Sequence, residues 1–451
     1  MFQRILIANR GEIAVRVIRA CHELGIEAVA VYSDADRDAL HVHMADHAVC
    51  IGPAQAAQSY LVQNQILAAA LQTKSEAIHP GFGFLSENAE FARICEEIGI
   101  QFIGPSAEAI RKLGHKTTAK QLMKENGVPV VPGPAGAFRD PTEALEASRS
   151  IGFPLILKAA SGGGGRGIRV AQKLEDFMPL FLEASQEAKN AFGDPDMYIE
   201  KFLVHPKHIE FQLIADQHGH CVSLGERDCS SQRRKQKIVE ESPSPVIRPE
   251  ERSRMGEILS LAFLKVGYHN AGTVEFLYEN GEFYFMEVNT RIQVEHPVTE
   301  MVNGIDLIRE QIRVAAGEPL SFSQADVHPQ GWAIEARINA EDPSKNFLPS
   351  AGRITNLRFP GGAGVRVDSA MFSGAQIPPY YDSMVAKIIA WDHTRERAVA
   401  RLMRAVHELE IAGVKTNREF VLKLLSSREF LEGHYSIDWV EKSLLAQGET
   451  S

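Results

Sequence analysis

Apolar residues in the first quarter of the chain group into short runs that alternate with helical repeats. Residues 4–8 and 27–33 are apolar runs that predict buried strands, and they flank a helical pattern at about 12–24. A second unit of this kind follows, and then come a helix at 87–98 and a strand at 101–104. Strands alternating with helices predict a parallel sheet covered on both faces. We therefore expect an α/β, doubly wound region of about 110 residues.

The pattern changes after about residue 115. Helical periodicity covers 116–126, and hairpin signals recur through 197–290, which favours an antiparallel α+β region. A third segment begins with the strand-like run Trp332–Asn339 and includes a helix at 394–408. We therefore expect three domains, with the boundaries 1–114, 115–330 and 331–446.

The first strand-to-helix turn bears on what the N-terminal region binds. This turn, Ala8–Glu12, lacks the Gly-x-Gly-x-x-Gly pattern that dinucleotide-binding folds carry there. Asp34 and Asp36 do lie some twenty-five residues further on, where such folds bind a ribose. A scaffold role is nevertheless favoured over dinucleotide binding.

The stretch from Phe283 to His296 carries the most informative polar pattern. It alternates like a strand, yet one face carries Glu287, Asn289 and Arg291. An acid, an amide and a guanidinium are costly to bury without partners. A divalent metal and phosphate groups would supply those partners.

The hairpin that contains this strand has two possible registers. A two-residue Asn280-Gly281 loop would leave Glu275 and Glu287 on opposite faces. A three-residue loop with Gly281 in the left-handed conformation would make them diagonal neighbours on one face. Because two close carboxylates favour a bound Mg²⁺, we predict the three-residue loop.

A glycine-rich run lies between two strand-like segments. Lys158 ends an apolar run, and the residues that follow include Gly163, Gly164, Gly165 and Arg166. Lys-Ser/Thr does not follow, so this is no Walker phosphate loop. A flexible hairpin tip is the simpler interpretation, but the two neighbouring cations favour a lid over nucleotide phosphates.

Four cations lie within the five residues 233–237. A solvated basic face is the ordinary interpretation of such a cluster. Alternation at strand spacing would instead place Arg233, Lys235 and Lys237 on one face, and an anion-binding strand is favoured.

Two histidine groups have ligand-like residue types. The first contains His41, His43 and His47, and the second is the hairpin-like His218-x-His220-Cys221. The first lacks a matching acidic or cysteine cluster, so ordinary histidines are favoured over zinc ligands in both.

Composition narrows the function classes. A formal charge of −10 argues against a general nucleic-acid or membrane-surface binder. The 5 cysteines are odd in number and form no Cys-x-x-Cys pair, which suggests reduced thiols. No apolar run is long enough to span a bilayer, and Met1 leads almost directly into a strand. We therefore expect a cytoplasmic protein.

Taken together, the motifs resemble those of the biotin carboxylases, the ATP-grasp components of biotin-dependent carboxylases. The similarity extends over about residues 1–446. The segments that carry it, besides the glycine-rich run, are Ile7–Ala14, His79–Asn88, Glu226–Cys229, Glu287–Glu300 and Pro378–Met384. The resemblance implies a Rossmann-like N-terminal domain, an ATP-grasp domain with a mobile lid at about 131–203, and a C-terminal α/β domain.

The resemblance also implies a reaction and its ligands. ATP and bicarbonate give carboxyphosphate, whose carboxyl group is transferred to a ureido nitrogen of biotin. The implied ATP contacts are Lys116, Lys158, Gly163, Gly164, Gly165, Glu200, Lys201, Leu203, His208, Gln232, Glu275 and Glu287. Glu275, Glu287 and Asn289 would hold Mg²⁺ or Mn²⁺. Bicarbonate would be bound by Lys237, Arg291, Gln293, Val294 and Glu295.

The family resemblance assigns the chemical roles to a few side chains. Glu295 would remove the bicarbonate proton, with Lys237 and Arg291 beside it. Arg337 would stabilise the biotin anion, and Phe82 and Asp382 would help to seat biotin.

Three positions depart from the usual family pattern. They are Phe82 in place of Tyr, Lys235 in place of His, and His115 in place of Asp. None of these replacements removes a catalytic group.

The sequence has no Met-Lys-Met biotinylation motif and no recognisable carboxyltransferase region. The resemblance therefore implies biotin on a separate biotin carboxyl carrier protein, separate carboxyltransferase subunits and a homodimer. Acetyl-CoA is the expected final acceptor, and a pyruvate, propionyl-CoA or other biotin-dependent carboxylase is the alternative. Another ATP-grasp carboxylate–amine ligase and a catalytically silent nucleotide-binding module are the less favoured interpretations.

Overall fold

The computed structural model describes residues 1–160 and 167–445. Contacts divide the chain into two compact units, which are described separately. The segments of the first unit are Met1–Val128, Lys207–Leu277 and Met286–Ser451, and those of the second are Pro129–Pro206 and Tyr278–Phe285.

The N-terminal part of the first unit is a doubly wound parallel sheet, as predicted. Its strand order is β3-β2-β1-β4-β5, and every neighbouring pair is parallel. The strands are β1 (Arg4–Ile7), β2 (Glu27–Tyr32), β3 (His47–Cys50), β4 (Ala77–His79) and β5 (Gln101–Phe102). The accompanying helices are α1 (Gly11–Glu23), α2 (Leu40–Met44), α3 (Gln63–Thr73), α4 (Ala89–Glu97), α5 (Ala107–Gly114) and α6 (Lys116–Glu125). Ile5, Leu6 and Ile7 are fully buried, because helices cover both faces.

The strand order reverses between β1 and β4, where loops of doubly wound sheets commonly form a ligand site. The Asn9 side chain joins the two loops there, donating to the carbonyls of Pro80 and Phe82 at 2.7 Å each. The turn after β1 is thereby fixed against the segment that contains Phe82.

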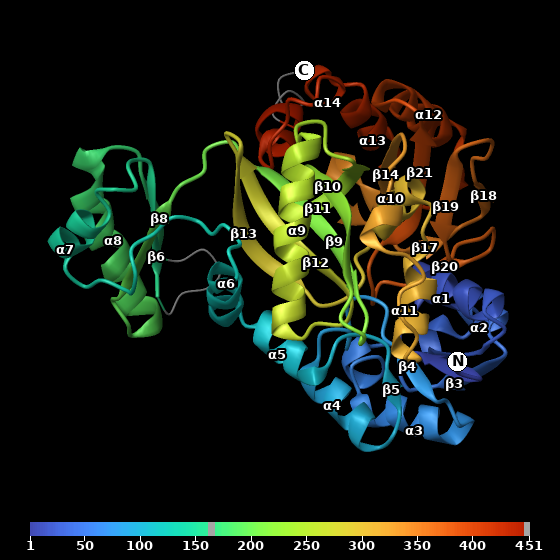
Figure 1. The fold of residues 1–451 in the computed structure, drawn as a ribbon. Helices are drawn as coiled ribbons and strands as arrows, with labels where there is room; N and C mark the ends of the chain where they lie inside the picture. Colours follow the sequence, from blue (N-terminus) through green and yellow to red (C-terminus); the bar gives the residue numbers. More distant parts are fainter. Residues whose placement is uncertain (161–166, 446–451) are drawn as a thin grey trace. The chain divides into compact units, whose positions relative to one another are not determined.

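An eight-stranded sheet forms the rest of the first unit's framework (Figure 1). Its order is β13-β12-β9-β10-β11-β14-β21-β19. The strands are β9 (Lys207–Ala215), β10 (Cys221–Arg233), β11 (Gln236–Ser242), β12 (Asn270–Glu279), β13 (Glu282–Asn289), β14 (Trp332–Asn339), β19 (Val365–Ser369) and β21 (Met384–Asp392). The sheet continues without a break from β11 to β14, which pair antiparallel.

Helices cover this sheet. They are α9 (Pro249–Val266), α10 (His296–Asn303), α11 (Leu307–Ala315), α12 (Arg395–Glu408), α13 (Arg418–Leu425) and α14 (Arg428–Leu431), with a π-helical turn at Val440–Leu445. The helix α9 crosses one face over β9 and β10 (Figure 1). Three short strand pairs complete the C-terminal region: β15 (Glu341–Asp342) with β16 (Leu348–Pro349), β17 (Gly352–Arg353) with β20 (Gln376–Ile377), and β18 (Asn356–Arg358) with β22 (Glu410–Ala412). Short 3₁₀ turns lie at Asp34–Asp36, Ala56–Gln58, Gln324–Asp326 and Pro343–Lys345.

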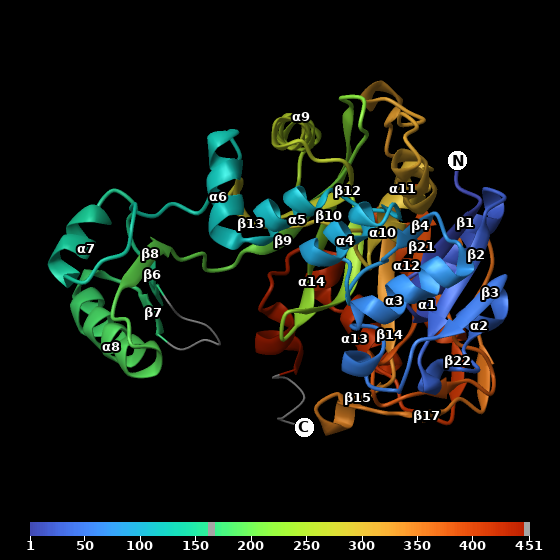
Figure 2. The same cartoon turned by 90° about the horizontal axis from the view of Figure 1, so that it is seen from below.

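The second unit is a small sheet with two helices. Its strands, in the order β7-β6-β8, are β6 (Leu155–Ala159), β7 (Ile168–Ala171) and β8 (Met197–Lys201), and both pairs are antiparallel. The helices α7 (Pro141–Ala147) and α8 (Leu174–Phe192) lie on the same side of this sheet (Figure 2). Asp140 caps α7 by accepting from the N–H of Thr142 at 2.7 Å, and Pro141 occupies the first turn. The sequence patterns had not predicted α8 or α9.

The turn between β12 and β13 differs from the prediction. β12 ends at Glu279 and β13 begins at Glu282, so Asn280 and Gly281 form a two-residue loop. Both have positive φ, 54° and 84°, which is the signature of a type I′ turn. The predicted three-residue loop is therefore wrong.

A shift along β13 nevertheless brings Asn289 to Glu275. Phe283 and Phe285 are buried, but the next buried residue is Val288, so the alternation moves by one position. The Asn289 amide then donates to Glu275 at 2.9 Å. The contact of β13 with Glu275 is therefore made by Asn289, and it follows from the irregular strand and not from the loop length.

The basic cluster at 233–237 is also a turn and not a continuous strand. Arg234 and Lys235 have φ of 49° and 66° and connect β10 to β11. Gln232 pairs with Lys237 across this hairpin. The predicted alternation of Arg233, Lys235 and Lys237 on one face is therefore wrong, because the chain reverses within the cluster.

A buried ion pair fastens the C-terminal helices to the large sheet. Glu241 is fully buried, and it accepts from Arg395 at 2.7 and 2.9 Å and from the Tyr435 hydroxyl at 2.5 Å. Arg395→Met should lower the free energy of unfolding by about 3–5 kcal/mol, because a buried charge would lose its cationic partner. Urea unfolding checks this value. The matched change Arg404→Met, at an exposed pair with Glu408, should leave the midpoint unchanged, and equal effects of the two changes would contradict the assignment.

Within residues 1–160 and 167–445, no helix is both long enough and apolar enough to cross a bilayer.

Candidate active site

A cavity of about 960 Å³ lies within the first unit. It brings together the β1 and β4 loops, the β10–β11 hairpin, the ends of β12, β13 and β14, and the segment after β20. Its charged part is lined by Lys116, His208, Gln232, Lys237, Glu275, Glu287, Asn289, Arg291, Gln293, Val294, Glu295 and Arg337. Its aromatic part is lined by Phe82, Phe84, Tyr380 and Tyr381, with Asp382 beside them.

Glu295 lies at the centre of the charged part, directly before α10. Its carboxylate is 1% exposed and contacts Lys237 Nζ at 2.5 Å and Arg337 Nη2 at 2.9 Å. Burial alone would raise the pKa of Glu295, but Lys237, Arg337 and Arg227 outweigh it and hold the pKa well below its ordinary value. Glu295 is therefore ionised at neutral pH and able to accept a proton.

Lys237 is shared among three carboxylates. Its Nζ lies 2.7 Å from Glu210, 3.2 Å from Glu275 and 2.5 Å from Glu295. Burial disfavours the ammonium, but surrounding anionic groups raise the pKa of Lys237 well above its ordinary value. The side chain therefore presents a fixed positive charge to the cavity.

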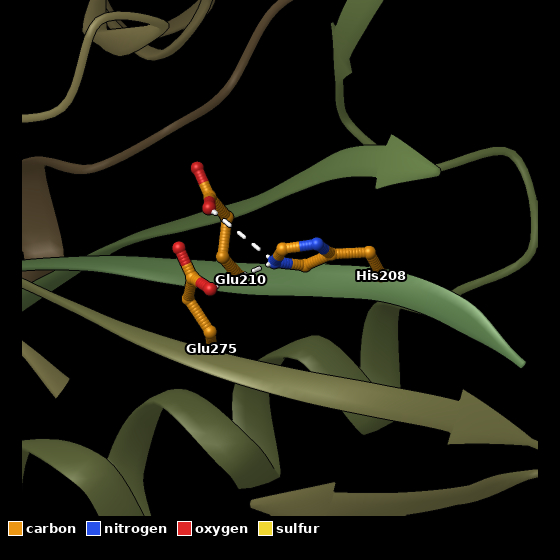
Figure 3. A group of neighbouring side chains, drawn as sticks. All are labelled: His208, Glu210 and Glu275. Carbon is orange, nitrogen blue, oxygen red and sulfur yellow. Dashed lines mark ion pairs between the residues drawn. The ribbon is translucent and has the colours of Figure 1, made fainter. Parts of the chain in front are cut away.

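His208 and two acids form a compact group on β9 and β12 (Figure 3). His208 Nε2 lies 3.1 Å from Glu275 and 3.9 Å from Glu210. Figure 3 shows both carboxylates turned toward the imidazole. Glu275 thus has three neighbours that favour its ionised form, namely His208, Lys237 and Asn289.

The residues expected to hold a metal form a suitable oxygen-rich set. Glu275, Glu287 and Asn289 line the same cavity, and the Asn289 amide is held against Glu275. Glu287 is bound by Lys116 Nζ at 3.0 Å. Two carboxylates and an amide oxygen fit the ligand preference of Mg²⁺.

Arg291 is held by a residue that the sequence patterns did not single out. Its Nε donates to Glu87 at 2.9 Å, while Nη2 donates to Asn289 at 3.1 Å and Nη1 to Gln293 at 2.9 Å. Gln293 in turn donates to Glu275 at 3.0 Å. One network therefore orients both the expected metal and the expected bicarbonate residues.

Arg337 extends from β14 between two acids. It donates to Glu240 at 2.6 Å and to Glu295 at 2.9 Å. Burial raises the pKa of Glu240 to about 7, in spite of Arg337. The guanidinium remains charged, and its contacts with Glu240 and Glu295 fix its planar fork in the cavity wall.

The aromatic part is built around Tyr381. Arg10 lies over the Tyr381 ring at 4.1 Å and pairs with Asp36 at 2.6 and 2.7 Å. Asp382 accepts from the N–H of Met384 at 2.8 Å. The ring-lined surface suits a flat, largely apolar ligand with a few polar edges.

The remaining expected nucleotide contacts belong to the second unit or lie outside the described residues. Lys158 on β6 pairs with Glu200 on β8 at 2.5 Å. Lys201 donates to the Phe153 carbonyl at 3.0 Å, and Leu203 is buried. Gly163, Gly164 and Gly165 lie outside the described residues.

Sequence reasoning missed Glu210, Arg227 and Glu240. Arg227 is fully buried and donates to Glu210 at 2.5 Å. One signal was available, because β9 alternates His208, Glu210 and Gln212 with Ile209, Phe211 and Leu213. A polar face on an otherwise apolar strand is the same pattern that identified β13.

Family comparisons cover most of the chain. The family described as "Biotin carboxylase, N-terminal domain" matches residues 1–110. "Carbamoyl-phosphate synthase L chain, ATP binding domain" matches residues 115–323, and "Biotin carboxylase C-terminal domain" matches residues 335–442.

Individual relatives are similar over nearly their full length. Biotin carboxylase 1 of Bacillus subtilis is 55% identical over 443 residues, which cover 98% of each chain. A pyruvate carboxylase subunit of Methanothermobacter thermautotrophicus is 51% identical, over 98% of this chain and 90% of that protein. A solved structure of the Hydrogenobacter thermophilus 2-oxoglutarate carboxylase biotin carboxylase domain dimer, in complex with MgADP, ADP and bicarbonate, has a TM-score of 0.87 at 48% identity, covering 98% of both chains. The chain therefore belongs to the biotin carboxylase family, whose members are ATP-dependent ligases.

Proposed function

We propose that this chain catalyses the first half-reaction of a biotin-dependent carboxylase, in which ATP and bicarbonate carboxylate biotin. One observation carries the proposal. A single cavity combines an ionised, buried acid, cations around it, an oxygen-rich metal set and an adjoining aromatic surface. Each of these parts corresponds to one requirement of the reaction.

Bicarbonate activation is proposed to take place at Glu295. Lys237 and Arg291 attract the anion, and the Glu295 carboxylate accepts its proton. A bicarbonate oxygen then forms a bond to the γ-phosphorus of ATP while the bond to the β-phosphate oxygen breaks, giving ADP and carboxyphosphate. When bicarbonate binds Lys237, this cation is shared with the anion and stabilises the Glu295 carboxylate less, which makes Glu295 a stronger base.

The contacts proposed for ATP are those that the family resemblance implies, and they are given for each unit by itself. In the first unit these are Lys116, His208, Gln232, Glu275 and Glu287, and in the second they are Lys158, Glu200, Lys201 and Leu203, with Gly163, Gly164 and Gly165 as the lid loop. Glu275, Glu287 and Asn289 would hold Mg²⁺, or Mn²⁺ with the same oxygen ligands. The metal, when bound, neutralises phosphate charge during transfer. We propose that residues 115–330 form the ATP-grasp domain and that its lid covers about 131–203. In the sequence this domain follows the domain 1–114 and precedes the domain 331–446.

Biotin is proposed to rest against the aromatic part of the cavity. Phe82 and Asp382 would position the ring system, and Arg337 would stabilise negative charge on the ureido oxygen as the nitrogen loses its proton. The ureido nitrogen then bonds to the carboxyl carbon as the bond between that carbon and the phosphate oxygen breaks, and the released phosphate takes up the proton that the nitrogen loses. Because Arg337 also contacts Glu295, it lies beside both the proposed site of bicarbonate activation and the proposed site of carboxyl transfer to biotin.

The proposed partners follow from the substrate. Biotin would arrive on a biotin carboxyl carrier protein, and separate carboxyltransferase subunits would complete the enzyme, with acetyl-CoA as the proposed acceptor. Relatives include one subunit of a pyruvate carboxylase and the domain of a 2-oxoglutarate carboxylase, so a 2-oxo acid is the competing acceptor. We also propose a homodimer and a cytoplasmic location. Identification of the carboxyltransferase that co-purifies with the chain distinguishes the acceptors.

The purified chain should release ADP from Mg·ATP only when bicarbonate is present, and free biotin should accelerate the release. Coupled measurement of ADP, with carboxybiotin detected from labelled bicarbonate, checks both steps. ADP release that requires an amine, and not bicarbonate, would support a carboxylate–amine ligase instead. The absence of turnover under every condition would support a silent nucleotide-binding module.

A further inference from the structure

Two cations face each other across the β14–β21 pair, on the side of the sheet that carries the site. Arg337 is the direct cross-strand partner of Lys387. Like charges at such positions repel, so a buried pair of this kind requires anionic or carbonyl partners for both members. The Arg337 partners are Glu240 and Glu295. The role of Lys387 is not explained by the proposed chemistry.

Lys387 binds the backbone next to Glu295. Its side chain is fully buried, and Nζ donates to the Val294 carbonyl at 2.8 Å. The ammonium also lies 3.1 Å from Glu12 and 3.9 Å from Asp368. Burial disfavours the charge, but Glu12, Glu335 and Asp368 outweigh it and raise the pKa of Lys387. The two cross-strand cations therefore bind two consecutive residues. Arg337 binds the carboxylate of Glu295, and Lys387 binds the backbone carbonyl of Val294.

Residues 291–295 form the bicarbonate loop. Within this loop, side chains also bind the carbonyls of Ile292 and Gln293, which precede Val294. Arg291 Nη1 donates to the Ile292 carbonyl at 3.1 Å, and His296 Nδ1 lies 2.8 Å from the Gln293 carbonyl. Burial, followed by Lys387 and Arg16, lowers the pKa of His296 well below its usual range. The neutral ring then carries its proton on Nδ1, since a carbonyl can only accept.

The orientation of these carbonyls fixes the neighbouring N–H groups. In a trans peptide unit, the C=O and the following N–H point in opposite directions. Holding the carbonyls of residues 292–294 therefore directs the N–H groups of Gln293, Val294 and Glu295 away from their side-chain donors. Those three N–H groups donate to no other residue in the described ranges, and all three residues line the cavity. Unpaired donors beside a cavity are suited to binding an anion.

We infer that Lys387 is a positioning residue that, together with His296, holds the bicarbonate loop so that its backbone N–H groups and the Glu295 carboxylate face the bound anion. This inference rests on the proposed function. It assigns Lys387 no contact with substrate, because its ammonium is fully buried against Val294, Glu12 and Asp368.

Lys387→Met tests the inference, since it keeps the length of the side chain and removes the donor. The KM for bicarbonate should rise by at least about tenfold, the effect of losing a charged hydrogen bond, while the KM for ATP changes by less than about threefold. Initial rates of ADP release at varied bicarbonate and varied ATP give the two values. The matched control is Lys423→Met, because Lys423 also donates to a backbone carbonyl, that of Leu444 at 2.9 Å, outside the cavity. The control should alter neither KM.

Three further variants complete the test. Lys387→Met leaves Glu12 without its cation, so the double variant Lys387→Met/Glu12→Gln removes both charges and should show the same bicarbonate defect if the single variant does not fold. His296→Asn retains a donor near the Nδ1 position and should keep the bicarbonate KM, whereas His296→Leu should raise it. An unchanged bicarbonate KM in the folded Lys387 variants, or an equal rise in both KM values, overturns the inference while the proposed function stands. A wild-type chain that shows no bicarbonate-dependent ADP release overturns both.

Discussion

Glu295→Gln is expected to lower bicarbonate-dependent ATP cleavage by about 10²–10⁴-fold, the usual effect of removing a general base. The amide has nearly the same shape but accepts no proton, and it loses the ion pairs with Lys237 and Arg337. Mg·ATP binding should be retained, because Glu295 is not among the proposed nucleotide or metal contacts. Steady-state ADP release and calorimetric titration with Mg·ATP measure the two properties.

The control for this change is another buried acid outside the cavity. Glu310 is 5% exposed and accepts from Ser321 at 2.7 and 3.1 Å. Glu310→Gln should leave turnover near the wild-type rate. Ordinary turnover in Glu295→Gln would exclude Glu295 as the base.

Arg337→Ala should reduce biotin carboxylation by about 10²–10³-fold, as expected when a preorganised donor to a developing anion is removed. Bicarbonate-dependent ATP cleavage should fall less, because Lys237 still contacts Glu295 at 2.5 Å. The ratio of carboxybiotin formed to ADP released is the informative measurement, and it should fall well below the wild-type ratio.

Arg337→Lys distinguishes charge from geometry. A lysine keeps the positive charge but not the planar fork that contacts Glu240 and Glu295 together. It should restore part of the ATP cleavage and less of the biotin carboxylation. Equal losses of the two activities in Arg337→Ala would contradict the assigned role in biotin chemistry.

Local patterns predicted much of the framework. The strand Trp332–Asn339 is β14 with the same bounds, and the N-terminal strand–helix–strand unit appears as β1, α1 and β2. These segments were predictable because their apolar periodicity is strong and agrees with the burial of their side chains. At Asn280-Gly281 two sequence signals disagree. Local turn chemistry favours a two-residue loop, which the structure has, whereas the expected closeness of two carboxylates favours a three-residue loop.

The site was predictable only where a polar residue interrupts an apolar pattern. Glu287 and Asn289 gave such a signal on one strand, and the family resemblance supplied Glu295 and Arg337. Glu240 and Lys387 gave no comparable signal, since their importance depends on which strands are neighbours. Glu240 meets Arg337 because β11 lies beside β14, although the two residues are far apart in the chain. Sheet order of this kind is set by tertiary packing and is not encoded in local periodicity.

The unbroken pairing of β11 with β14 determines where related genes can be recombined. A crossover near residue 331 would build one sheet from two different parent proteins. The Glu240–Arg337 contact would then have to form between strands that come from different parents. Unmatched strand edges at such a seam favour aggregation over folding. The segment Pro129–Pro206 has its own buried cluster of Phe177, Phe181 and Met197. Chimaeras exchanged at its two ends, with the hairpin tip Tyr278–Phe285 taken from the same parent, should therefore fold more often than chimaeras joined at 331.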